Sequence, residues 1–218
     1  QAVSACGEGA SPAAATDTSA AATCRARRPM ADNREAETPW KPTPFEVLEA
    51  VRSLYADEVK PFCRIILKRL HQRAGGARPY IDPKYIRHVC EGMPEIIIEP
   101  ADKSELAALL KKEAVTFVEA TSPVDPYPKR MWDQAAEYFE GLQGPEASLP
   151  CGRYACAVVL ADRKLPFLAQ RTLGEICHIV QLAISRDLLG YLGGRLVPYG
   201  MSEKRTKALG ATPAPSWR

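Results

Sequence analysis

Histidine and cysteine, the side chains that most often carry chemistry in proteins, are few in this chain and lie far apart. The three histidines (His71, His88 and His178) fall on three different predicted helices, and no Cys-x-x-Cys pair occurs, so neither residue type has the spacing of metal ligands. Cys177 and His178 are neighbours on a predicted helix, where successive side chains point about 100° apart and form no nucleophile–base pair. The usual motifs of nucleotide, metal and hydrolase sites are also missing. We therefore expect a protein that is not an enzyme and that needs no cofactor.

Positive charge is the feature with a clear chemical use. Residues 60–88 hold eight lysines and arginines against one acid, Asp82, although the whole chain carries a net charge of only +3. Lysine and arginine side chains gathered in this way neutralise the phosphates of a nucleic acid. The candidate RNA-contacting residues of this segment are Lys60, Arg64, Lys68, Arg69, Arg73, Arg78, Lys84, Arg87 and His88.

The same charges also have an ordinary structural interpretation. An amphipathic helix needs a solvated face, and lysine and arginine supply it in many proteins. Lys60, Arg64 and Lys68 follow one another at four-residue steps, which predicts one ridge along a single helix. Solvation alone explains any one such ridge, whereas the almost acid-free length of the whole segment favours the binding of a polyanion.

Three predicted helices position these charges. The first begins at Thr43, a capping residue followed by Pro44 and, three residues on, by the capping-box acid Glu46. The second lies within residues 59–76, and the third begins after its cap, Asp82. The apolar stripe of the first helix consists of Phe45, Leu48, Val51, Leu54 and Tyr55.

Two short strands are expected to complete this first unit. Residues 95–100 form a β-branched run bounded by prolines, and residues 115–120 form a second run of this kind. The composition of residues 104–113, between them, predicts a short helix. Three helices followed by two strands is the order of a winged helix-turn-helix.

A second unit follows the proline-rich connector of residues 121–128. Residues 129–142 and 152–161 predict two helices, and Thr172 with Glu175 forms the capping box of a third. Gly193 and Gly194 then predict a two-residue hairpin turn, in which Leu192 opposes Arg195 and Tyr191 opposes Leu196. The third helix is expected to bury Ile176, Ile179, Val180 and Ala183 and to present a polar face of Gly174, His178, Gln181 and Ser185.

The expected fold class is therefore α+β, mainly helical, with two tandem winged-helix-like units that carry short β-hairpin wings. The units span residues 42–122 and 127–210. The Ala/Ser/Thr-rich residues 1–40 predict a disordered arm, and residues 211–218 predict a tail. No run of about 18 apolar residues predicts a membrane helix. Seven scattered cysteines favour a reducing, intracellular location, cytoplasmic or nuclear.

Two stretches resemble the OST-HTH, or LOTUS, domain and the OST-HTH-associated domain that follows it. The first is TPFEVLEAVRSLYADEVKPFCRIILKRL with YIDPKYIRHVCEGMPEIIIEP, and the second is CGRYACAVVLADRKLPFLAQRTLGEICHIVQLAISRDLLGYLGGRLVPY. The resemblance implies a winged-helix RNA-binding module of RNA granules and RNA silencing. It also implies G-rich RNA as the ligand in some relatives and a DEAD-box helicase as the partner in others. The chain departs from the family where residues 82–85 replace a glycine–aromatic pair and where residues 104–113 resemble an insertion in the wing.

We expect a non-catalytic RNA-binding module whose second and third helices contact phosphates. The alternative is an adaptor that docks a DEAD-box helicase or another RNA-granule component through an apolar helical face, with Leu182 and Ile184 as the candidate exposed residues. Binding of duplex DNA by the third helix ranks last. Only Lys84, Arg87 and His88 would reach base edges there, and that helix has no asparagine or glutamine to read adenine.

Overall fold

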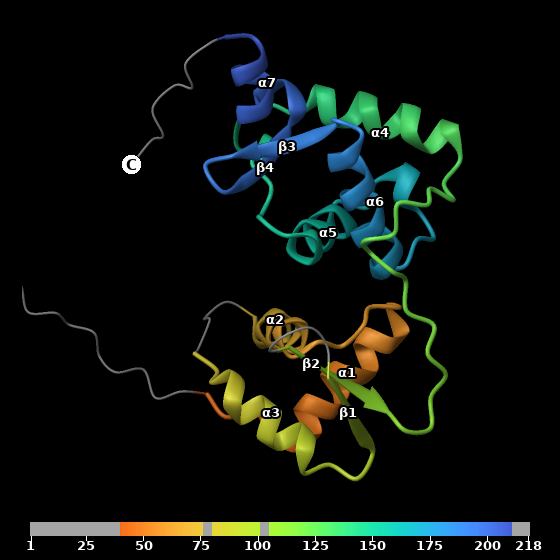
Figure 1. Cartoon of the computed structure of the whole chain (residues 1–218), viewed down its shortest axis with the longest axis vertical. Coiled ribbons are helices and arrows are strands. Elements are labelled where there is room, and N and C mark those ends of the chain that lie inside the picture. The colour runs from red at the N-terminus through yellow and green to blue at the C-terminus, as the bar shows by residue number, and fades with distance from the viewer. Residues whose placement is uncertain (1–39, 76–79, 101–104, 211–218) are drawn as a thin grey trace, which may run out of the picture. The chain divides into compact units, whose positions relative to one another are not determined.

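The expected fold class is confirmed: the described part of the chain is mainly helical, with two winged-helix-like units and two short antiparallel hairpins (Figure 1). The structure is a computed structural model that describes residues 40–75, 80–100 and 105–210. The predicted arm before Trp40, the predicted tail and Arg78 lie outside the described residues. The α-helices are α1 (Pro44–Ala56), α2 (Cys63–Ala74), α3 (Pro83–Glu91), α4 (Lys129–Gly141), α5 (Arg153–Asp162), α6 (Leu173–Ser185) and α7 (Glu203–Ala208). The strands are β1 (Ile96–Pro100), β2 (Leu106–Leu110), β3 (Leu189–Leu192) and β4 (Arg195–Pro198), and the 3-10 helices are η1 (Gly144–Ala147), η2 (Pro166–Leu168) and η3 (Tyr199–Met201).

Capping side chains define the starts of α1, α3 and α6, as predicted. The Thr43 hydroxyl accepts from the Glu46 amide at 3.2 Å while the Glu46 carboxylate accepts from the Thr43 amide at 2.7 Å, so the capping box of α1 is complete. Asp82 caps α3 by accepting from the Lys84 amide at 2.9 Å. These side chains satisfy amides that a helix cannot bond internally. The expected apolar stripe of α1 is wrong at Phe45, whose ring is 68% exposed.

The wing of the first unit differs from the prediction. Residues 106–110 form strand β2 rather than a helix, and residues 115–120 form no strand. β2 pairs with β1 in an antiparallel register from Ile96 opposite Leu110 to Pro100 opposite Leu106. The leucines and alanines of β2 have no strong strand preference of their own, so the partner strand decides their conformation. The segment that resembles an insertion is therefore the second strand of the wing itself.

The second helix is shorter than expected, because the chain stays extended as far as Phe62. Pro61 offers no amide donor to a helix, and Phe62 forms a bridge to Ala107 of β2. Lys60 therefore precedes α2 and does not belong to its surface. The predicted ridge of Lys60, Arg64 and Lys68 along one helix is wrong, and only Arg64 and Lys68 share α2.

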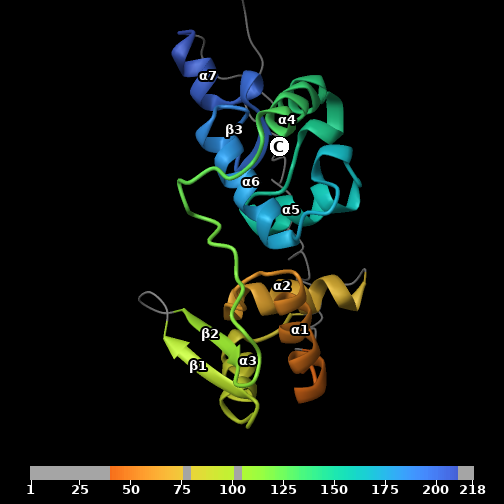
Figure 2. The ribbon, with the colours of Figure 1, turned by 90° about the vertical axis from the view of Figure 1, so that its right-hand side faces the viewer.

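The second unit repeats the order of the first. Here α4, α5 and α6 precede the β3–β4 hairpin, as α1, α2 and α3 precede the β1–β2 hairpin (Figures 1 and 2). Leu149 lies before α5 and exchanges two backbone hydrogen bonds with Leu196 of β4, at 2.8 and 3.1 Å. Leu149 therefore corresponds to Phe62, which precedes α2 and forms the equivalent bridge to β2. We call α1 to β2 the N-terminal module and α4 to α7 the C-terminal module.

The predicted hairpin of the C-terminal module is confirmed. Gly193 and Gly194 have φ angles of +54° and +74°, which glycine adopts without strain, and this is the geometry of a type I′ turn. Leu192 pairs with Arg195 and Tyr191 pairs with Leu196, in the expected register. The turn chemistry alone therefore fixed the pairing of these two strands.

Helix α6 is the most enclosed element of the C-terminal module. Its capping box of Thr172 and Glu175 is present, and its predicted apolar stripe is buried. The predicted polar face is wrong at Gly174 and His178, which are both buried. The suggestion that Leu182 is exposed is also wrong, since its side chain is 5% exposed, whereas Ile184 is half-buried.

Among the described residues, no helix is long and apolar enough to cross a membrane.

Candidate nucleic-acid interface

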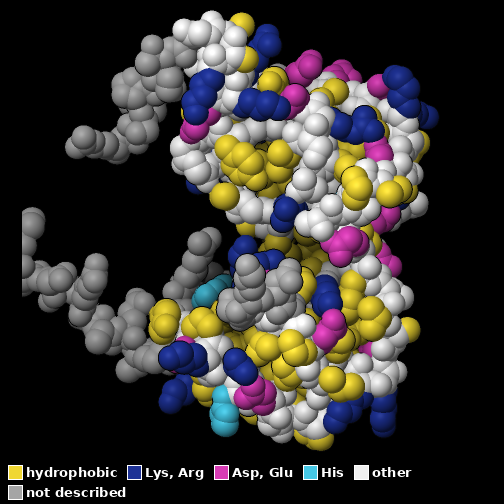
Figure 3. Space-filling view, viewed as in Figure 1, with side chains coloured by type: hydrophobic (Ala, Val, Ile, Leu, Met, Phe, Trp, Pro, Cys, Tyr) yellow, Lys and Arg dark blue, Asp and Glu magenta, His cyan; other side chains and the backbone are white. Residues whose placement is uncertain are grey.

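Several of the predicted basic residues are paired with carboxylates: Lys60, Arg64, Arg69 and Arg87. Figure 3 shows lysine and arginine side chains interspersed with aspartate and glutamate on the face in view. Two wing carboxylates account for part of this pattern. Lys60 pairs with Glu99 at 3.2 Å, and Arg64 pairs with Glu105 at 2.7 Å. Surface pairs of this kind contribute little free energy, so a phosphate can displace them, but they lower the local positive potential.

Arg69 is a structural residue in this arrangement. Its side chain is 11% exposed and pairs with Asp57, the C-cap residue of α1, while its Nε donates to the Tyr154 hydroxyl of α5 at 2.8 Å. Its guanidinium also lies 5.9 Å from the centre of the Tyr154 ring. Burial opposes the charge, but the hydrogen bonds to Asp57 and Tyr154 outweigh it and raise the pKa of Arg69. Because its donors are used inside the protein, we leave Arg69 out of the proposed RNA surface.

The remaining predicted contacts lie on the exposed sides of α2 and α3. Arg73, Lys84 and His88 are exposed, and Arg87 pairs with Glu91 one helical turn away at 2.7 Å. None of these four residues lines the cavity described next. Their contact with RNA stays a prediction.

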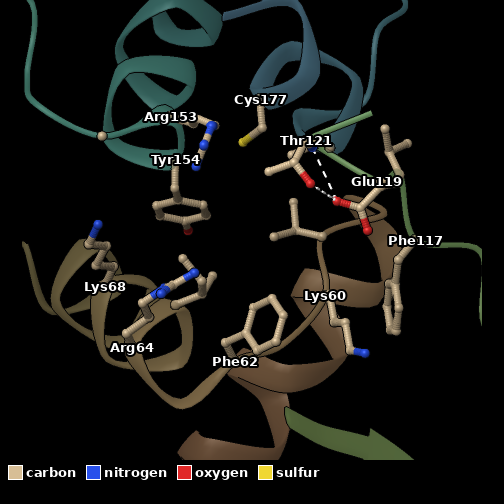
Figure 4. A pocket seen from close by; sticks show the side chains of 16 residues that line it. Lys60, Phe62, Arg64, Lys68, Phe117, Glu119, Thr121, Arg153, Tyr154 and Cys177 are labelled. Carbon is tan, nitrogen blue, oxygen red and sulfur yellow. Dashed lines mark hydrogen bonds between the residues drawn. The ribbon is translucent and has the colours of Figure 1, made fainter. Parts of the chain in front are cut away.

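A groove brings part of the predicted basic set together with residues from the C-terminal module. It has a volume of about 350 Å³ and lies between α2, residues 111–128, and the starts of α5 and α6 (Figure 4). From here on, residues 111–128, which join β2 to α4, are called the connector. Both modules belong to one structural unit. The groove is lined by Val59, Lys60, Phe62, Arg64, Ile65, Lys68, Phe117, Val118, Glu119, Ala120, Thr121, Gly152, Arg153, Tyr154, Gly174 and Cys177. This list contains four cationic and three aromatic side chains.

Two cations meet at the end of the groove formed by α5. A methyl group built on Gly152 would lie 3.9 Å from Lys68 Nζ, so the amino group of Lys68 reaches the start of α5 beside Arg153. The Nε of Arg153 donates to Gln181 at 2.6 Å, which holds the exposed guanidinium in place. Among the described residues, neither Lys68 nor Arg153 has a carboxylate partner within 4.0 Å. This pair is therefore the part of the groove best suited to a phosphate.

Aromatic side chains lie among the cations of the groove and on its opposite wall. Phe62 is half-buried, and Lys60 Nζ and Arg64 Cζ lie 5.6 and 5.4 Å from the centre of its ring. Figure 4 shows Phe62 between Arg64 and Lys60, with Phe117 on the wall formed by the connector. Half-exposed aromatic faces beside cations are the usual features of single-stranded nucleic-acid sites.

Neither Arg153 nor the aromatic residues were among the sequence-predicted contacts. Arg153 lies more than sixty residues beyond the basic segment, in a stretch whose sequence has no excess of charge. Only the packing of α5 beside α2 brings it to Lys68. A partial signal was present for Phe62, because an aromatic residue between Lys60 and Arg64 is the basic–aromatic alternation typical of single-strand binding.

The thiol in the groove is suited to packing rather than to chemistry. Burial raises the pKa of Cys177 to about 12, and it does the same for Cys156. A thiol with such a pKa is almost wholly protonated at neutral pH, and the thiol form is a poor nucleophile. Among the described residues, no group of three or more His, Cys, Asp or Glu side chains could hold a metal ion.

Cysteine alkylation tests these assignments. In a variant with Cys6 and Cys24 replaced by serine, iodoacetamide at pH 8 should modify Cys151 first, because it is exposed. Cys90, Cys156 and Cys177 should react at least about a hundredfold more slowly, since each is buried and has a pKa of about 12. Peptide mass spectrometry over time measures the four rates. Rapid labelling of Cys177 in the folded protein would show that the wall of the groove is open.

A buried histidine of α6 contacts the connector. His178 of α6 is 4% exposed; its Nε2 lies 3.0 Å from the Ser122 carbonyl and its Nδ1 lies 3.1 Å from the Tyr127 hydroxyl. A carbonyl only accepts hydrogen bonds, so Nε2 donates to it. His178 therefore fixes the connector against α6 and positions the adjoining Glu119 and Thr121 at the groove.

Comparison with known families supports one half of the resemblance. Residues 145–210, which include α5, α6, the β3–β4 hairpin and α7, match the family model of the OST-HTH Associated domain. The chain has no significant match among curated proteins or solved structures. The family models detect no OST-HTH (LOTUS) domain in the N-terminal module, so that assignment stays a prediction.

Proposed function

We propose that the protein is a non-catalytic RNA-binding module that holds an RNA strand in the groove between its two modules. The observation that supports the proposal is the convergence of Lys60, Arg64, Lys68 and Arg153 with aromatic side chains in one cavity. Phosphates would contact Lys68 and Arg153, and bases would lie against Phe62. The match of residues 145–210 to the OST-HTH Associated domain is consistent with an RNA-related role.

The proposal changes the expected set of contacts. Arg153 joins the set and Arg69 leaves it, because the first faces the groove and the second is bonded inside the protein. Arg73, Lys84, Arg87 and His88 would extend the contact surface beyond the groove if the RNA continues over α2 and α3. Binding rather than catalysis is proposed because burial raises the pKa of Cys177, the thiol of the groove, to about 12, which leaves it a poor nucleophile. The carboxylate of the groove, Glu119, accepts a hydrogen bond from the Thr121 amide.

Charge reversal in the groove tests the proposal. Lys68→Glu and Arg153→Glu should each weaken the binding of a single-stranded RNA about tenfold. Each should also reduce the slope of log affinity against log salt concentration by about one. Fluorescence polarisation over a salt series measures both quantities. Lys207→Glu, a charge reversal on α7 outside the groove, is the matched control and should change the affinity little.

Two results would contradict the proposal. The wild-type protein could fail to bind RNA at about 50 mM salt, where electrostatic binding is strong. Alternatively, the groove variants could bind as Lys207→Glu does. A folded protein without RNA affinity would favour the adaptor alternative, although Leu182, one of the two residues that suggested a docking face, lies in the core.

A further inference from the structure

The groove contains one feature that phosphate binding does not explain. Among the described residues that line it, Glu119 is the one acid, and a carboxylate repels a polyanion. Its position is fixed: the Thr121 amide donates to Glu119 Oε1 at 3.1 Å, and the Thr121 hydroxyl donates to the same oxygen. The other oxygen, Oε2, accepts no hydrogen bond from any described residue. One carboxylate oxygen is therefore held by the protein while the other is left for a ligand.

Glu119 is ionised in this position. The hydrogen bonds from the Thr121 hydroxyl and amide, together with the charge of Lys60, lower the pKa of Glu119 below its usual value. An ionised carboxylate accepts hydrogen bonds and donates none. Its partner in the groove must therefore present an N–H or O–H donor.

The two walls of the groove differ in their side chains, so the phosphate and the base of one nucleotide would contact different walls. In Figure 4, Lys68, Arg64, Arg153 and Tyr154 lie on one side of the groove, and Glu119, Thr121, Phe117 and Lys60 lie on the other, with Phe62 between them. The charge of Lys60 is paired with Glu99, whereas Lys68 and Arg153 have no carboxylate partner among the described residues. A phosphate beside Lys68 and Arg153 would direct the base across Phe62 toward Glu119. The edge of that base, rather than its phosphate, would then meet the carboxylate.

We propose, on the basis of the RNA-binding function proposed above, that the groove receives one unpaired base and that Glu119 accepts a hydrogen bond from its exocyclic amine. Glu119 is then a specificity-determining residue. Cytosine presents an N4 amine to such an acceptor, and glutamate accepts from this group in known protein–nucleic acid pairs. Uracil presents the O4 carbonyl at the same position, which would repel the carboxylate. The two pyrimidines have rings of equal size, so contact with Phe62 does not distinguish them.

A matched pair of RNAs tests this inference. Oligocytidine and oligouridine decamers, titrated at pH 7.5 with fluorescence polarisation, should differ about tenfold in affinity in favour of cytidine. Glu119→Gln should reduce the ratio to one or below, because the amide nitrogen of glutamine donates to the uracil carbonyl while its oxygen still accepts from Thr121. Glu113→Gln removes the same charge from an exposed residue outside the groove and should leave the ratio unchanged.

The readout separates this inference from the proposed function. Loss of a negative charge raises the affinity for every RNA, so the ratio between the two decamers is the informative quantity. Equal binding of the two decamers, or a ratio that Glu119→Gln leaves intact, would show that Glu119 only stabilises the connector and would overturn the inference while leaving RNA binding in place. Failure of the wild-type protein to bind either decamer would reject RNA binding, and the base preference with it.

Discussion

Replacing Arg69 with alanine should lower the free energy of unfolding by about 2–3 kcal/mol. The guanidinium joins three elements, since from its position on α2 it bonds Ser53 of α1, the α1 C-cap residue Asp57, and the Tyr154 hydroxyl of α5. Its removal leaves Asp57 without its partner and takes a donor from Tyr154. Loss of one member of a fully buried pair costs about 3–5 kcal/mol, and the partial exposure of Asp57, 35%, reduces this estimate.

Urea denaturation measures the effect of the Arg69 substitution, and a surface arginine supplies the control. Arg52→Ala removes a pair with Glu49 on the exposed side of α1, where the two side chains are 48% and 32% exposed, and it should cost under about 0.5 kcal/mol. Arg69→Met retains most of the packing, so it separates the polar contribution from the loss of volume. If Arg69→Ala were as stable as Arg52→Ala, the junction of α1, α2 and α5 would not depend on this side chain.

The helices could be predicted where their starts are encoded in neighbouring residues. Thr43, Asp82 and Thr172 each cap a helix through a bond that reaches two or three residues along the chain, and the glycine pair at 193–194 fixes a hairpin in the same local way. Strand β2 could not be predicted, because the conformation of residues 106–110 depends on pairing with β1 and with the distant Phe62, and not on the preferences of its own leucines and alanines. Local chemistry therefore identified the helices better than it identified the wing.

The site depends on tertiary packing to a greater degree. A charge count selected Arg69, although the contacts of α2 with α1 and α5 turn its guanidinium inward. The same count did not select Arg153, which lies outside the basic segment of residues 60–88 but reaches the groove beside Lys68. His178 was assigned to a polar face because helical periodicity separates polar from apolar positions, yet the Ser122 carbonyl and the Tyr127 hydroxyl satisfy its ring inside the protein. Composition therefore selects candidate residues, whereas packing decides which of them share the groove.

The groove exists only where the two modules are held together, and the end of α1 carries that contact. The Gly174 amide at the start of α6 donates to the Asp57 carbonyl at 2.8 Å, and the Thr172 hydroxyl donates to the Glu58 carboxylate at 2.9 Å. The Glu58 carbonyl also accepts from the Val118 amide of the connector at 3.0 Å. The C-terminal end of α1, the connector and the N-terminal end of α6 are thereby fixed at one point on the wall of the groove.

Gly174→Ala should disrupt this point. A β-carbon at residue 174 would lie 2.5 Å from the Glu58 carbonyl oxygen, a backbone atom that cannot rotate away. We expect a loss of stability of about 2 kcal/mol from this overlap, although alanine is the better helix former by about 1 kcal/mol. Because Val118 and Gly174 both line the groove, RNA affinity should fall with the stability.

Thermal denaturation, hydrogen exchange at the Val118 amide and RNA titration measure the three consequences of Gly174→Ala. Gly141→Ala is the matched control, since Gly141 ends α4 and a β-carbon there would meet no atom within 4 Å. That variant should be as stable as the wild type or slightly more so. If Gly174→Ala shares this behaviour, the end of α1 can move away from α6 without cost, and the groove is not rigid. If it loses stability and Val118 protection while Gly141→Ala does not, the close approach of α1 and α6 is what sets the walls of the groove.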